Sequence, residues 1–285
     1  MEEEGVSRPL VDVRLKQSAE GTKVALTCSD RTTVMSIGQL LPALRSLTNS
    51  VVDAAVQREE KAGGKISCKA GCGACCRQLV PISVAEAREL PSLIASLNPA
   101  HRDRVTARFE DAISSLQASG LWDRLQNLAT IPLEERIAFA MEYVSKGIPC
   151  PFLEDESCSI HENRPLICRQ YLVTSPASHC KNPNAETISR VPLAADAFRA
   201  LRHIEAQDED RPRFVPLVLA PFLKLGDDES SQAVSDWVRR LLAEIKQIND
   251  ERIAEKRSSE ATRHRDASML EQSVAPDGET DASHP

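Results

Sequence analysis

The sequence predicts a mostly α-helical protein with a small N-terminal β-hairpin and irregular cysteine-rich loops. Three observations lead to this fold class. Apolar residues recur at helical spacing in several segments, a short N-terminal segment alternates apolar and polar residues, and eight of the nine cysteines stand in loop-like stretches between helical segments. Apolar residues make up 41% of the 285 residues, which is enough for a sizeable core.

The predicted hairpin comes first. Residues 11–15 and 23–28 alternate apolar and polar side chains and flank Ala19, Glu20 and Gly21, a pattern typical of two antiparallel strands joined by a turn. We therefore assign residues 1–35 to an N-terminal hairpin segment.

A helical cysteine-cluster domain is predicted next, over residues 36–256. Its first helix runs from residue 37 to Gly63-Gly64, and its second is started by the capping box of Ser83 and Glu86. Further apolar stripes follow at helical spacing. They are Val105, Phe109, Ala112 and Leu116; then Leu133, Ile137, Met141 and Val144; then segments 193–204 and 227–253. Residues 257–285 have few apolar side chains and are predicted to be a disordered tail.

Eight cysteines fall into two groups with the patterns C-x3-C-x2-C-C and C-x7-C-x9-C-x11-C. Closely spaced thiolates are soft ligands that select zinc, copper(I) or iron–sulfur clusters. The groups must meet in space to share a metal centre, either as two four-cysteine sites or as one cluster with supporting thiols. The predicted ligands are Cys68, Cys72, Cys75 and Cys76 with Cys150, Cys158, Cys168 and Cys180.

Disulfides are the alternative use of these cysteines. The chain begins Met-Glu-Glu-Glu, without the pattern of a secretory signal, and its longest apolar stretch, near residues 214–225, is too short to span a bilayer. We therefore expect a cytoplasmic protein, and in that reducing compartment clustered cysteines favour metal. The odd cysteine count and the strain of joining adjacent Cys75 and Cys76 also disfavour a full disulfide framework.

The identity of the metal stays open between an iron–sulfur cluster and zinc. Irregular ligand spacing favours the cluster, whereas a closed four-thiolate zinc site would only stabilise the loops. Arg77, Arg164 and Arg169 flank the cysteines, and their guanidinium groups would stabilise a negatively charged centre from its second shell. His161 and His179 are expected to be exposed loop residues, and Cys28 a small buried apolar residue.

Around the cysteines the chain resembles the YkgJ family of bacterial cysteine-cluster proteins, whose zinc- or iron-chelating domain is named for a CxxCxxCC motif. The resemblance covers residues 64–180, including Cys76-Arg77-Gln-Leu-Val, Cys150-Pro-Phe-Leu and Arg164-Pro-Leu-Ile-Cys168. The first cysteine gap is one residue longer than the motif, and position 161 is His where relatives often have Tyr. The resemblance implies metal binding. Some relatives are described as iron–sulfur proteins or oxidoreductases, others as flagellin lysine N-methylases.

The sequence thus predicts a metal-binding protein with a redox, electron-transfer or metal-handling role. Two alternatives stay open: a zinc-stapled module that docks a protein partner through the 227–253 helix, and a protein lysine N-methylase of the flagellin type. Whether the chain is an enzyme is undecided. A net charge of −7 and a pI near 5.5 argue against nucleic acid or an anionic membrane as the main partner.

Overall fold

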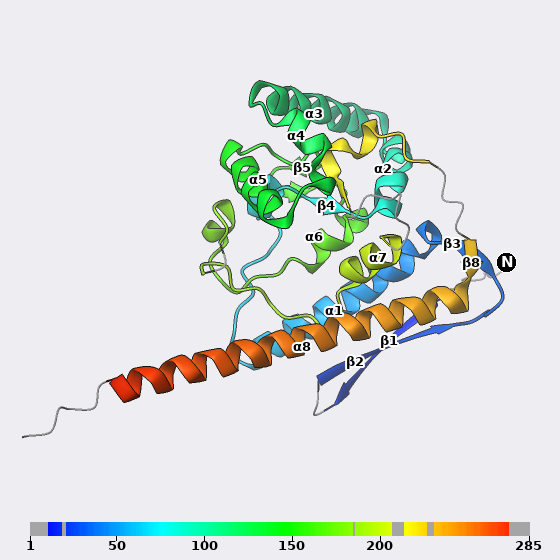
Figure 1. Ribbon diagram of the computed structural model, residues 1–285. Coiled ribbons are helices and arrows are strands. Elements are labelled where there is room, and N and C mark those ends of the chain that lie inside the picture. Colours follow the sequence, from blue (N-terminus) through cyan, green and yellow to red (C-terminus); the bar gives the residue numbers. More distant parts are fainter. Residues whose placement is uncertain (1–10, 19–20, 185, 207–213, 227–230, 274–285) are drawn as a thin grey trace, which may run out of the picture. The chain divides into compact units, whose positions relative to one another are not determined.

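The computed structural model describes residues 11–18, 21–184, 186–206, 214–226 and 231–273. Contacts divide the chain into two units, Met1–Ile245 and Lys246–Pro285. The described part is mostly helical, as predicted (Figure 1). Its α-helices are α1 (Leu41–Lys61), α2 (Val84–Ser96), α3 (Pro99–Ala118), α4 (Trp122–Gln126), α5 (Leu133–Lys146), α6 (Leu166–Gln170), α7 (Ala197–Glu205) and α8 (Val234–Ser273).

Short 3-10 helices and strands complete the first unit. The 3-10 helices are η1 (Gly38–Leu40), η2 (Ala74–Arg77), η3 (Leu128–Thr130), η4 (His161–Asn163), η5 (Ala177–Lys181) and η6 (Leu217–Phe222). The strands are β1 (Val11–Ser18), β2 (Gly21–Cys28), β3 (Val34–Ser36), β4 (Pro81–Ile82), β5 (Leu153–Glu154), β6 (Ser157–Cys158), β7 (Val215–Pro216) and β8 (Ser231–Ala233). Within the described residues they form antiparallel pairs, β1–β2, β3–β8, β4–β7 and β5–β6.

The predicted N-terminal hairpin is confirmed. In β1–β2, Val11 pairs with Cys28 and Ser18 pairs with Gly21, so the ladder extends beyond the residues whose alternation predicted it. Residues 19–20, at the predicted turn, lie outside the described residues. The hairpin contacts α1, which buries the side chains of Val11 and Leu26.

Helices α1 and α2 begin as the sequence predicts. Pro42 stands in the first turn of α1, where the missing N–H costs no hydrogen bond. In α2, the Glu86 N–H donates to Ser83 Oγ at 3.1 Å, and the Ser83 N–H donates to Glu86 Oε2 at 3.0 Å. This reciprocal capping box fixes the start of α2 directly after the first cysteine group and strand β4.

Helix α3 buries its predicted face, but the prediction for α5 was wrong. Leu133 and Ile137 of α5 are 58% and 56% exposed, whereas Phe139 and Tyr143 on another face are buried. Both faces are apolar at helical spacing, and the aromatic face buries more area. The guanidinium carbon of Arg124 lies 5.0 Å from the centre of the Phe139 ring and covers it.

The main core cluster lies between α2, α3, α5 and the η6 segment, and it also receives the second cysteine segment. The rings of Phe109 and Phe152 meet edge to face, with centres 5.5 Å apart. Phe152 follows Cys150 closely in the chain, so this contact anchors the start of the second cysteine group on α3. Strand β4 pairs with β7 next to the same cluster, with Ile82 opposite Val215.

Helix α8 has the apolar stripe that the sequence predicts: Val234, Trp237, Val238, Leu241 and Ile245 are buried in the first unit. The predicted start at Asp227 lies outside the described residues. The helix continues past Arg257 to Ser273, where the sequence predicts a disordered tail, because Ala, Glu, Lys and Arg in this stretch favour helix. Residues 274–285 lie outside the described residues.

In the second unit, Lys246 and Asp250 form a helical ion pair at 2.6 Å, one turn apart. A search of the described residues finds no helix with the length and apolar character that crossing a bilayer requires.

Candidate metal centre

The first cysteine group lies on the loop after α1 and on η2. Gly71 has a φ of +80°, a left-handed conformation that glycine adopts without steric cost. The loop then closes through two backbone bonds, from the Cys72 N–H to the Lys69 carbonyl at 3.1 Å and from the Cys76 N–H to the Gly73 carbonyl at 3.0 Å. This tight winding holds the four closely spaced cysteines on one compact loop.

Gly73 is needed for a different reason from Gly71. Its backbone has no positive φ, but a Cβ atom added there would lie 2.7 Å from both Leu153 Cδ1 and Glu156 Oε2. The hairpin of the second cysteine group therefore rests directly on the first loop. The Gly71 N–H strengthens this contact by donating to Ser157 Oγ at 3.1 Å.

That hairpin, β5–β6, carries Cys158 opposite Leu153. Its two turn residues, Asp155 and Glu156, have φ values of +48° and +56°, which are strained for residues other than glycine. Arg77 compensates by an ion pair: its Nη2 lies 2.5 Å from Glu156 Oε1. Arg77 Nη1 also donates to the Gly73 carbonyl at 2.9 Å, so one guanidinium joins both cysteine segments.

The two cysteine groups lie against each other in the fold. The Cys150 N–H donates to the Cys76 carbonyl at 2.7 Å, and Gln78 Nε2 donates to the Cys180 carbonyl at 3.0 Å. Cys68 Sγ lies 3.8 Å from the Tyr171 carbonyl oxygen. Residues that are far apart in the chain thus surround one region, which is the spatial condition for a shared metal centre.

All nine cysteines are in the described part of the chain and are free thiols. Cys180 is buried, and the others are partly buried. Within the described residues, no three Cys, His, Asp or Glu side chains already have the close geometry of a bound ion. The structure therefore gathers the predicted ligands in one region without arranging them as a finished coordination sphere.

Burial keeps several of these thiols protonated. It raises the pKa of Cys150 to about 12, raises that of Cys168 well above its ordinary value, and also raises those of Cys158 and Cys180. The pKa of Cys75 is raised first by a hydrogen bond with the Cys76 thiol and then by burial. Since the thiolate is the metal ligand, metal binding here must release protons, and affinity must fall as the pH is lowered.

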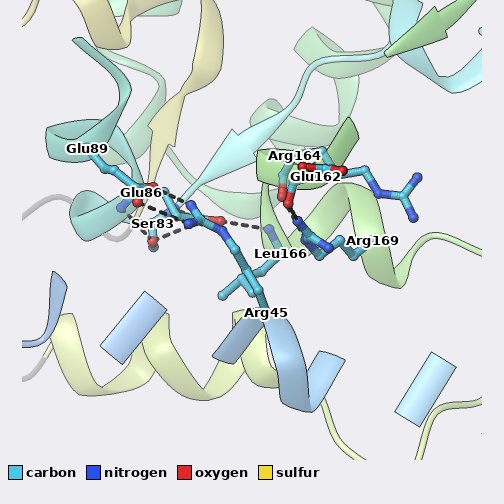
Figure 2. Close-up of polar contacts among 8 residues, drawn as sticks. All are labelled: Arg45, Ser83, Glu86, Glu89, Glu162, Arg164, Leu166 and Arg169. Atoms are coloured by element: carbon cyan, nitrogen blue, oxygen red, sulfur yellow. Dashed lines mark hydrogen bonds and ion pairs between the residues drawn. The ribbon is translucent and has the colours of Figure 1, made fainter. Parts of the chain in front are cut away.

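Of the three arginines predicted to flank the metal ligands, Arg169 has a structural role in the fold. It is buried, its Nε donates to the Arg164 carbonyl at 2.9 Å, and its Nη1 donates to Asn49 Oδ1 at 2.9 Å. Figure 2 shows Arg169 also pointing at the Glu162 backbone, whose carbonyl accepts from its Nη2. Arg169 thereby fixes the turn that leads into α6 and Cys168.

Arg164 is placed differently. Its Nε is buried and, within the described residues, has no hydrogen-bond partner. Burial raises the pKa of Cys68 and Cys158, and the Arg164 guanidinium opposes that rise in both thiols. In Figure 2 the side chain of Arg164 extends away from Arg169. A buried donor without a partner beside several thiols fits an anionic group bound among them.

Glu86 supports the site in a way that the sequence did not reveal. It is buried, and besides capping α2 its Oε1 accepts from the Leu166 N–H at 2.7 Å at the start of α6 (Figure 2). One carboxylate thus positions α2, which follows the first cysteine group, and α6, which carries Cys168 of the second. The capping box was visible in the sequence, but no local signal pointed to the bond with Leu166.

The remaining predictions concern histidines and Cys28. His161 is exposed, as expected, whereas His179 is partly buried and its Nδ1 lies 3.0 Å from the Thr187 carbonyl. Cys28, predicted to be buried, is only partly so, because it ends strand β2.

Free thiols, most of them partly buried, on two joined segments are the arrangement expected of a cysteine-cluster domain that can chelate metal. Residues 67–188 match the family model CxxCxxCC, described as "Putative zinc- or iron-chelating domain". This match confirms the resemblance drawn from the cysteine pattern and supports metal binding. Neither the curated proteins nor the solved structures include a match to the chain.

Proposed function

We propose that the chain binds an iron–sulfur cluster or zinc through its eight clustered cysteines and serves in electron transfer, redox chemistry or metal handling. The observation that carries this proposal is the contact between the two cysteine groups. In this contact the Cys150 N–H donates a hydrogen bond to the Cys76 carbonyl at 2.7 Å. The expected ligands are the eight cysteines of these two groups. A reducing compartment such as the cytoplasm would keep these thiols available for metal.

The donor set fits the proposed metal. Thiols select zinc and iron–sulfur clusters over oxygen-preferring ions such as magnesium or calcium. When bound, an iron–sulfur cluster supplies one-electron transfer, whereas a four-thiolate zinc site supplies structural stability. The protein's part is to hold the ligand loops, through Gly73, Arg77 and Glu86, and to exclude water by burying the thiols.

The surroundings favour the iron–sulfur cluster over zinc. A cluster with thiolate ligands is negatively charged and contains sulfide acceptors, and its potential rises with nearby hydrogen-bond donors. The buried Nε of Arg164 is such a donor, beside Cys68 and Cys158. Arg164→Met would then shift the reduction potential of the cluster to a more negative value. Arg169→Met, in contrast, would chiefly destabilise the fold.

The deciding experiment is elemental analysis of the full chain purified without oxygen. A brown protein with iron and acid-labile sulfide in comparable amounts is expected. Cys72→Ser and Cys168→Ser should sharply reduce bound metal, and the matched control Cys28→Ser should not. Metal-free wild-type protein, or equal metal content in all three variants, would refute the proposal.

A zinc-stapled interaction module is the second candidate. The predicted docking helix, residues 227–253, does not favour it, because Trp237, Leu241 and Ile245 of its apolar stripe are buried. One other observation does: Leu133 and Ile137 on α5 are 58% and 56% exposed. A colourless product that contains only zinc would select this candidate. The protein N-methylase alternative requires binding of S-adenosylmethionine, which calorimetric titration of the purified chain would detect.

A further inference from the structure

The clustered thiols lie in two different surroundings. Cys68 and Cys72 pack with buried Cys180 in a small apolar cluster around Val173, distinct from the main core cluster. The Ser67 N–H donates to the Val173 carbonyl at 2.9 Å, which joins the segment of Cys68 to the segment that leads to η5. We call Cys68, Cys72 and Cys180 the first thiol set.

The second thiol set consists of Cys150, Cys158 and Cys168. Cys150 and Cys158 pack against the main core cluster, and β5–β6 joins them: Leu153 pairs with Cys158, and its N–H donates to the Cys150 carbonyl at 2.8 Å. Cys168 comes from α6. Helix α6 contacts strand β4, whose Ile82 belongs to the same main core cluster.

Cys75 and Cys76 stand between the two sets on one turn of η2. The thiols of these adjacent residues lie in contact with each other. The Cys76 carbonyl accepts from the Cys150 N–H at 2.7 Å, in the second set. Gln78, just past η2, donates to the Cys180 carbonyl at 3.0 Å, in the first set. One turn of backbone therefore borders both sets.

We propose that the eight cysteines form two separate four-thiol metal sites that meet at the peptide bond between Cys75 and Cys76. Each thiol set forms one site and takes one of these two adjacent thiols as its fourth ligand. This inference rests on the proposed function, since it distributes the ligands of the metal that function requires. Four thiolates are the usual complement of a structural zinc ion or of an iron–sulfur cluster.

Stepwise metal removal from the wild-type full chain tests this arrangement. The metal-loaded protein is treated with increasing chelator, exposed thiols are alkylated, and the modified cysteines are identified by peptide mass spectrometry. The expected result is two steps, with the members of one thiol set becoming reactive together and those of the other set later. Simultaneous reaction of all eight cysteines after chelation would overturn the two-site arrangement. If the eight cysteines react before any chelator is added, the proposed function itself has failed.

Variants provide an independent measurement. Cys72→Ser should remove the metal of the first set and leave the second set protected from alkylation, and Cys158→Ser should do the reverse. The two losses should add in the double variant, and Cys28→Ser should retain all metal. Cys75→Ser and Cys76→Ser should each empty a different site. Complete metal loss from either Cys72→Ser or Cys158→Ser, with helical content unchanged by circular dichroism, would indicate a single shared centre and contradict the inference.

Discussion

The two cysteine groups reach the same region by different means. The first is local: four cysteines lie within residues 68–76, wound by Gly71 and one 3-10 turn. The second extends over residues 150–180 through a hairpin, a short helix and two 3-10 turns. The hairpin, the helix and the second 3-10 turn are each held by a contact from elsewhere in the chain. Close spacing in the sequence is therefore enough to bring the cysteines of the first group together. The cysteines of the second group are brought together only by contacts between distant parts of the chain.

The largest effect is expected where the second group is anchored. Phe152→Ala removes a fully buried ring that packs on Phe109 and should cost about 3 to 5 kcal/mol of unfolding free energy. Phe222→Ala is the matched control: its ring also contacts Phe109, with centres 6.1 Å apart, but it is 51% exposed. Urea unfolding measures both, and equal losses would show that Phe152 does not anchor the second group.

A buried carboxylate allows the supporting framework to be tested by pH. Burial raises the pKa of Glu205 from 4.5 to about 7, while its oxygens accept from the N–H groups of Val84 and Ala85. The folded state then holds more protons than the unfolded state between these pH values, so stability should fall as the pH rises from about 4.5 to about 7, by on the order of 2 kcal/mol.

Glu205→Gln should flatten this pH dependence, because the amide does not titrate. Glu60→Gln, at an exposed position on α1, is the control and should leave the slope unchanged. Thermal or urea unfolding at several pH values measures the difference between the variants. A Glu205→Gln slope identical to that of the wild type would show that this carboxyl does not titrate as the structure implies.

The contact between the two groups is tested at Gly73. Gly73→Ala places a Cβ within 2.7 Å of the β5–β6 hairpin and should cost about 1 to 3 kcal/mol as the hairpin is pushed away. Gly226→Ala has no atom within 4 Å of its added Cβ and no positive φ, and it serves as the control. Both the amount of bound metal and the free energy of unfolding should fall in Gly73→Ala but not in the control. A Gly73→Ala variant with unchanged stability would mean that the two cysteine groups are not in close contact.

The smallest effect is expected at the ion pair of Arg77 and Glu156, which is largely exposed. The hydrogen bond from Arg77 holds the pKa of Glu156 below its ordinary value, so the pair stabilises the fold above that value and its contribution is lost as the pH falls through the lowered pKa. Arg77→Met should remove this acid-side dependence, as measured by unfolding at decreasing pH. Unchanged dependence would show that the pair does not hold the hairpin turn.

Local patterns predicted much of this molecule. The alternation of residues 11–28 gave the hairpin, Ser83 and Glu86 gave the start of α2, and the stripe ending at Leu116 gave the buried face of α3. Each of these is decided by neighbours within a few residues in the chain. The cysteine spacing likewise pointed to the family model that residues 67–188 match.

Other features depend on partners that no local pattern names. Helix α5 has two apolar faces, and only packing decides that Phe139 and Tyr143 are buried while Leu133 is exposed. The bond from Leu166 to Glu86 joins residues far apart in the chain. The close approach at Gly73 also needs the folded hairpin, because the atoms it meets belong to Leu153 and Glu156, which lie far away in the sequence.

The position of the two groups in the chain has a consequence for folding. All of α2, α3, α4 and α5 lies between Cys76 and Cys150. Metal coordinated across the groups would act as a cross-link that closes this segment into a ring and lowers the entropy of the unfolded chain. Metal removal would then increase proteolytic cleavage throughout this helical segment, well beyond the loops that carry the cysteines.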